Sequence, residues 1–166
     1  MLPVIIADAG PLIELAKLEL LNLLPQVFAR LIVPKPVLVE ATVEGQLGSD
    51  SVLQFVADNG GFIEILSTVQ GEMIDALSVT LGRGEVQAIH WARELGHPVL
   101  LDDRRARKHA VANGVQFFGI GGFVLRCKQL GLIDAVVPLL HKLQTHDYFL
   151  ADALVEKLAV AANEHI

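Results

Sequence analysis

Short apolar runs alternate with helix-like segments along nearly the whole chain, and this alternation is the feature that most limits its possible folds. The run "PVIIAD" at residues 3–8 is rich in β-branched residues, and "GPLIELAKL" at 10–18 follows it with a proline in its first helical turn. Runs of the same kinds predict strands over 30–36, 62–66, 98–102 and 115–119, and helices over 36–43, 50–61, 71–79, 84–96, 103–114, 121–130, 134–145 and 150–163. Strands that alternate with helices in this way predict an α/β fold with a mainly parallel sheet.

The composition indicates one globular domain over residues 1–166, which we expect to carry a helical C-terminal extension from about residue 134. Hydrophobic residues make up 52% of the 166 residues and charged residues 19%. No apolar run approaches the roughly 18 residues of a membrane span, and the N-terminus has no basic region of a signal peptide. Cys127 is the only cysteine, so no internal disulfide can form. These features favour a cytoplasmic protein with no membrane partner.

Charge is distributed unevenly along the chain. The protein has a net charge of −6, yet residues 83–128 contain eight of its 13 basic residues and four acidic ones, a local balance of +4. This asymmetry is a modest indication of a phosphate-bearing partner, and solvated helix faces would explain it equally well.

Two predicted strands end on acidic residues. Asp8 ends the strand at 3–8, and Asp102 ends the strand at 98–102, with Asp103 next. Functional groups in parallel α/β sheets gather at the carboxyl ends of the strands, so we expect these acids to meet at one edge of the sheet.

Two further acids lie on apolar helix faces. Glu40 has Val37 and Val43 as helical neighbours, and Glu85 opens the helix over 84–96 on a face of small apolar residues. Either acid has a structural explanation: Glu40 could reach the surface or cap a neighbouring backbone, and Glu85 could complement the helix dipole. Alternatively, both could join the acids at the strand ends.

Converging carboxylates repel one another, and one or two hard cations would relieve that repulsion. Oxygen-only ligands suit Mg²⁺ or Mn²⁺. The six histidines form no H-x-x-x-H or H-x-H pattern, and the chain has no G-x-S-x-G, P-loop or G-x-G-x-x-G motif. A receiver or phosphatase would need paired aspartates at the first strand, where "ADAG" offers one.

Five segments occur in the order seen in PIN-domain proteins. This family has the fold of VapC-like metal-dependent ribonucleases. They are "IIADAGPLIELAKL", "LIVPKPVLVE", "LGRGEVQAIHWAREL", "VLLDDRRARKHA" and "FFGIGGFVLRCKQLGLI". The chain most resembles the branch marked by a G-R-G-E segment, over about residues 3–155. The resemblance implies a three-layer α/β/α fold with a parallel sheet, and acids that bind Mg²⁺ or Mn²⁺.

The resemblance also implies the catalytic and metal-binding residues. The first three acids of the family pattern correspond to Asp8, Glu40 and Glu85. The fourth corresponds to Asp102 or Asp103, with a slight preference for Asp102. We expect the phosphate contacts to come from the basic residues of the next helix, Arg104, Arg105, Arg107 and Lys108.

The sequence therefore predicts a metal-dependent endoribonuclease that cleaves RNA phosphodiester bonds with a metal-activated water. Many PIN relatives are the toxin of a toxin–antitoxin pair, so the resemblance implies a small antitoxin partner and a homodimer. Ala9 and Ile120 stand where relatives often carry residues with a hydroxyl group. The absence of these hydroxyls could weaken a metal site. The alternative is therefore a weak or inactive PIN fold that acts as an RNA- or protein-binding regulatory module.

Overall fold

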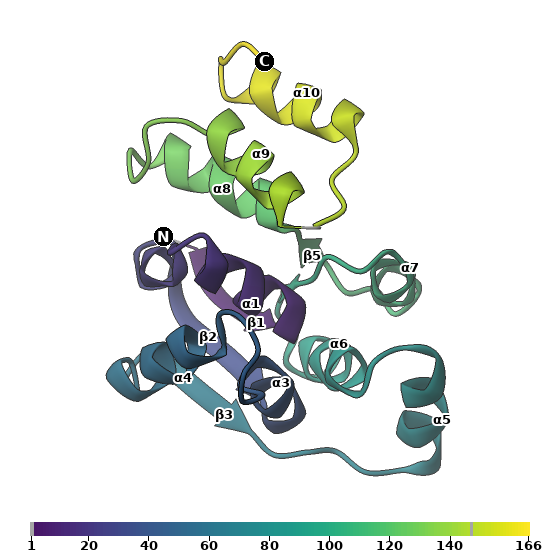
Figure 1. The fold of residues 1–166 in the computed structure, drawn as a ribbon. Helices are drawn as coiled ribbons and strands as arrows, with labels where there is room; N and C mark the ends of the chain where they lie inside the picture. The colour runs from purple at the N-terminus through teal and green to yellow at the C-terminus, as the bar shows by residue number, and fades with distance from the viewer. Residues whose placement is uncertain (1, 147) are drawn as a thin grey trace. The chain divides into compact units, whose positions relative to one another are not determined.

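The computed structural model describes residues 2–146 and 148–166 and divides into two compact units, Met1–Phe118 and Gly119–Ile166 (Figure 1). The first unit contains the whole sheet. The second unit is helical. The prediction of one domain with a helical extension from about residue 134 stays a prediction.

The sheet of the first unit has five strands, all parallel, in the order β3-β2-β1-β4-β5. The strands are β1 (Leu2–Ala7), β2 (Phe28–Pro34), β3 (Ile63–Leu66), β4 (Val99–Leu100) and β5 (Phe117–Phe118). All five predicted strands are present, and the predicted α/β fold with a parallel sheet is confirmed. The strands β4 and β5 are shorter than predicted, with two residues each.

Helices connect the strands of the first unit. They are α1 (Ala9–Lys17), η1 (Leu21–Leu23), α2 (Leu24–Val27), α3 (Lys35–Ala41), α4 (Ser49–Asp58), α5 (Glu72–Thr80), α6 (Arg83–Leu95) and α7 (Arg104–Ala112). The short elements η1 and α2 were not predicted. They occupy "LNLLPQV", a leucine-rich stretch in which Pro25 lies in the first turn of α2.

Burial of apolar residues explains why these segments pack together. Ile5 and Ile6 of the central strand β1 are fully buried. The helix α6 packs against β1, β2 and β4 through a face that includes the buried Val86 and Ile89. Leu95, which the helical spacing places on that face, is instead 42% exposed, because the helix ends there at Gly96 in the left-handed conformation.

The second unit consists of α8 (Ile120–Gln129), α9 (Val137–Thr145) and α10 (Asp152–Ala161), close to the predicted helices. Its core includes Phe123 and Leu140, and Cys127 is buried as a free thiol. Near the end of the chain, the carboxylate of Glu164 accepts hydrogen bonds from the backbone nitrogens of Val136 and Val137 at the start of α9. These bonds connect the residues after α10 to α9.

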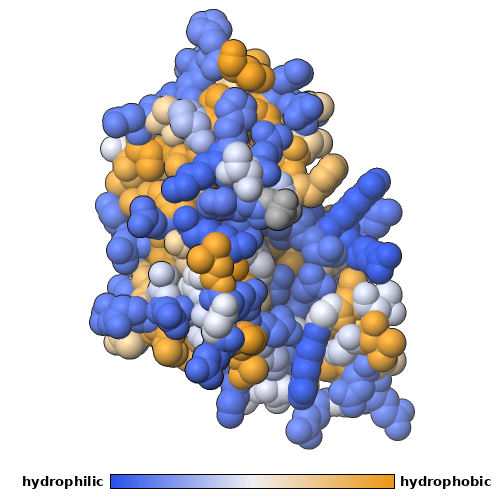
Figure 2. Space-filling model, viewed as in Figure 1, coloured by the Kyte–Doolittle hydropathy of each residue, from blue (hydrophilic) through white to orange (hydrophobic). Residues whose placement is uncertain are grey.

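Hydrophilic side chains cover much of the face shown in Figure 2, with apolar groups scattered among them. None of the helices among residues 2–146 and 148–166 combines the length and apolar character needed to cross a membrane.

Candidate metal and nucleic-acid site

Asp8 and Asp102 follow the carboxyl ends of two neighbouring strands, β1 and β4. From β1 the chain proceeds to β2 and β3 on one side, then returns to form β4 on the other side of β1. The connections after β1 and β4 therefore diverge, which in parallel α/β sheets opens a crevice for a ligand. The sequence prediction that these two acids lie at one edge of the sheet agrees with this topology.

Asp8 is the most buried acid of the group, with only 5% of its surface exposed. Its Oδ1 atom is fully buried and accepts no hydrogen bond. Burial raises the pKa of Asp8 to about 7; the backbone N–H of Ala9 opposes this, and the charges of Glu85, Glu40 and Asp102 add to it. A buried carboxylate with an unsatisfied oxygen is costly, so this position favours a compensating cation or a proton.

Glu40 lies near the end of α3, and its carboxylate contacts the first turn of α6. Its Oε1 accepts a hydrogen bond of 2.9 Å from the backbone nitrogen of Gly84. A Cβ atom built on Gly84 would lie only 2.6 Å from Oε2 of Glu40. The absence of a side chain at Gly84 therefore allows Glu40 to approach the helix.

Glu85 caps its own helix and also interacts electrostatically with two other acids. Its Oε2 accepts a hydrogen bond of 2.9 Å from the backbone nitrogen of Gly82, which caps the start of α6. The pKa of Glu85 is raised, chiefly by burial and further by the charges of Asp103 and Glu40, although the bond from Gly82 opposes this. Glu85 is thus a capping residue that also interacts electrostatically with the other acids.

Asp102 and Asp103 have different partners. Oδ1 of Asp102 lies 2.9 Å from Nη2 of Arg107, and the Asp102 side chain is 12% exposed. Asp103 is exposed and accepts a hydrogen bond of 2.9 Å from the backbone nitrogen of Ala106, so it caps α7. Asp102 interacts electrostatically with Asp8, and Asp103 with Glu85.

The predicted phosphate-binding residues lie on α7, directly after these two acids. Arg104, Arg105 and Lys108 are exposed. Arg107 differs, because its Nε donates to the carbonyl oxygen of Leu101 at 3.0 Å while its Nη2 binds Asp102. The exposed three are accessible to a phosphate, whereas Arg107 binds Asp102.

The chemistry of these acids suits a hard divalent cation, because all five offer oxygen ligands and the buried Oδ1 of Asp8 accepts no hydrogen bond. Among residues 2–146 and 148–166, however, no three His, Cys, Asp or Glu side chains lie close enough together to hold a metal ion as they stand. Glu40, Glu85 and Asp102 each direct one oxygen to a hydrogen-bond donor of the protein. Metal binding would therefore require side-chain rotations.

Gly82 and Gly84 are parts of the site that were not predicted from the sequence. Their backbone nitrogens hold Glu85 and Glu40. A glycine inside a helical pattern is a signal for close approach, and Gly84 in "LGRGE" carried that signal. Ala9, which has no hydroxyl, is buried at the start of α1.

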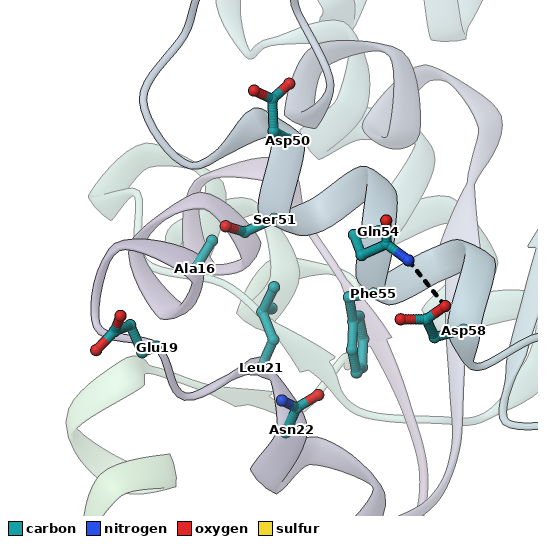
Figure 3. Close-up of a pocket in the computed structure, with 9 residues that line it drawn as sticks. All are labelled: Ala16, Glu19, Leu21, Asn22, Asp50, Ser51, Gln54, Phe55 and Asp58. Atoms are coloured by element: carbon teal, nitrogen blue, oxygen red, sulfur yellow. Dashed lines mark hydrogen bonds between the residues drawn. The ribbon is translucent and has the colours of Figure 1, made fainter.

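A separate cavity of about 490 Å³ lies in the first unit, beside α4 and the turn that follows α1 (Figure 3). Phe55 and Leu21 contribute apolar surface, and three carboxylates also line it: Glu19, Asp50 and Asp58. None of the predicted site residues lines this cavity.

Comparison with known proteins identifies the family. A family model described as a PIN domain matches residues 4–164. No curated protein matches the chain. The match covers nearly the whole sequence and agrees with the parallel sheet and with the acids at its edge. The chain therefore belongs to the PIN-domain family, whose members are in general nucleases that use divalent metal ions.

Proposed function

We propose that this protein is an endoribonuclease that depends on Mg²⁺ or Mn²⁺. The observation that carries the proposal is the buried carboxylate of Asp8, which has an oxygen without a partner and interacts with Glu40, Glu85 and Asp102. A purely structural aspartate in such a position would be expected to have its hydrogen bonds satisfied.

Asp8, Glu40, Glu85 and Asp102 would hold the metal, with Asp103 beside them. When bound, a divalent ion supplies an activated water and stabilises negative charge on the scissile phosphate. The carboxylates would also orient the attacking water. Asp8 is fixed by its position after β1, where its backbone nitrogen donates to the carbonyl oxygen of Leu100 at 3.1 Å.

The exposed cations of α7 would bind the RNA backbone. Arg104, Arg105 and Lys108 lie within one and a half turns that begin next to Asp103. Contacts to phosphates position a nucleic acid without reading its sequence, so these residues would place a strand beside the acids.

An RNA cleavage assay tests this proposal. Wild type should cleave single-stranded RNA in Mg²⁺ or Mn²⁺ and lose activity in chelator. Asp8→Asn should abolish cleavage and metal binding while the circular dichroism spectrum stays that of a folded protein. Wild-type cleavage that persists in chelator would contradict metal dependence.

One observation favours a second candidate, a PIN fold with weak or no activity that acts as a binding module. Four of the five acids already accept hydrogen bonds from donors within the protein, and Ala9 offers no hydroxyl to support the site. RNA binding without cleavage, in any divalent metal, would support this candidate.

We further propose that the protein is the toxin of a toxin–antitoxin pair and forms a homodimer. This rests on its resemblance to PIN-domain toxins. A neighbouring gene for a small protein that inhibits the nuclease would support it, and light scattering would measure the oligomeric state.

A further inference from the structure

Arg107 makes three contacts that fix its side chain beside the acidic site. Its Nη2 donates to Asp102, its Nε donates to the carbonyl oxygen of Leu101, and its guanidinium carbon lies 5.0 Å from the centre of the Phe117 ring. A guanidinium fixed in this way has lost much of the freedom that an exposed arginine retains. Its contact with Asp102 is an ion pair of 2.9 Å between two largely buried side chains.

We propose that Arg107 is a positioning residue that serves as an internal counter-ion of the carboxylate site and lowers its affinity for divalent metal. This inference rests on the proposed metal-dependent function. Arg107 supplies one fixed positive charge to an edge of the sheet where several carboxylates converge. It also occupies Oδ1 of Asp102, which a metal ion would otherwise use.

Two physical effects act in the same direction. Removal of the guanidinium charge makes the site more negative, which strengthens attraction for a divalent ion. It also releases the Asp102 oxygen for coordination. In the absence of metal the same change removes the compensating charge and increases repulsion between the acids, so the metal-free protein should lose stability.

The test is calorimetric titration of the full chain with Mn²⁺. Arg107→Gln should bind Mn²⁺ about three- to tenfold more tightly than wild type, with the range set by the Coulomb effect of one nearby charge. Its melting temperature should fall in chelator and recover in excess Mn²⁺. Arg107→Lys keeps the charge and should stay within about twofold of wild type, since the Coulomb term is retained.

Arg30→Gln is the matched control. Arg30 forms an ion pair of the same 2.9 Å length with Glu64, and both side chains are well exposed. This variant loses the same charge away from the acids, so its Mn²⁺ affinity should equal that of wild type. If Arg107→Gln does not fold, Phe117→Leu loosens the guanidinium and should also raise the affinity.

The outcomes separate the two proposals. If wild type and Arg107→Gln bind Mn²⁺ with equal affinity, or the variant binds more weakly, Arg107 is only structural and the inference is overturned. If the variant binds and wild type does not, the inference holds in its strongest form. If neither protein binds Mn²⁺, the inference and the proposed metal dependence both fail.

Discussion

The backbone nitrogen of Gly84 donates a hydrogen bond of 2.9 Å to the carboxylate of Glu40, a residue 44 positions earlier in the chain. The contact joins the end of α3 to the first turn of α6 and brings Glu40 next to Glu85. It depends on glycine, because a Cβ atom at position 84 would lie 2.6 Å from Oε2 of Glu40.

Gly84→Ala should therefore displace Glu40 with little loss of stability. The clash falls on the far end of a flexible side chain, and alanine favours a helix over glycine by about 1 kcal/mol. We expect a melting temperature close to that of wild type, with weaker Mn²⁺ binding and slower RNA cleavage. Gly122→Ala is the control, because a Cβ atom there meets nothing within 4 Å. Unchanged Mn²⁺ binding by Gly84→Ala would remove Glu40 from the site.

The metal-free protein should become less stable as the pH rises from about 4 to 7. The pKa of Asp8 is raised from 3.8 to about 7, so the folded state keeps a proton that the unfolded state releases within this window. The cost, on the order of 4 kcal/mol, is fully present above pH 7. Denaturant unfolding in chelator at several pH values would measure it. Asp8→Asn should show a shallower pH dependence, and an equal slope in both proteins would contradict the assignment.

Glu85→Gln separates the capping role from the electrostatic role. Glutamine still accepts the bond from Gly82 but removes one charge from the acids. In chelator the variant should be neutral or more stable by up to about 1 kcal/mol. In excess Mn²⁺ wild type should gain stability by mass action, and the variant should gain less. If the variant melts lower in chelator and both proteins respond equally to Mn²⁺, Glu85 is only a capping residue.

Neutralisation of Arg104, Arg105 and Lys108 should weaken RNA binding and reduce its salt dependence. Each phosphate contact releases counterions, so three lost contacts should lower the slope of log affinity against log salt by roughly two. Fluorescence anisotropy over a range of salt concentrations would measure this slope. An unchanged slope would place the RNA elsewhere. Arg30→Gln, compared with the single variant Arg105→Gln, controls for the loss of one positive charge away from α7.

Glu164→Gln should destabilise the second unit at neutral pH. Burial opposes the charge of Glu164, but hydrogen bonds from Lys128, Val136 and Val137 outweigh it, so its pKa is lowered. Its stabilisation is therefore present above its ordinary pKa of 4.5 and is lost as the pH falls through the lower folded value. We expect a cost of about 1–3 kcal/mol at pH 7 by thermal unfolding. Equal stability at pH 7 would contradict this role.

The sequence by itself determined the order of strands and helices, because local periodicity and turn residues decide the type of each element. It also determined that Asp8 and Asp102 follow two strands of the sheet, since strand ends can be predicted from apolar runs, but only the fold made those strands neighbours. The strand boundaries predicted from the sequence were less accurate at β4 and β5, which have two residues each. The ends of such short strands are defined by hydrogen bonds to neighbouring strands rather than by local propensity.

Only the tertiary structure decided how the acids are held. The approach of Glu40 to Gly84 joins residues far apart in the chain, and no local pattern encodes that distance. The three contacts of Arg107 likewise depend on where the fold places α7 relative to Asp102 and Phe117, so no local pattern predicted that this residue binds Asp102. Local sequence specifies which groups reach the edge of the sheet, and long-range packing specifies which of them touch.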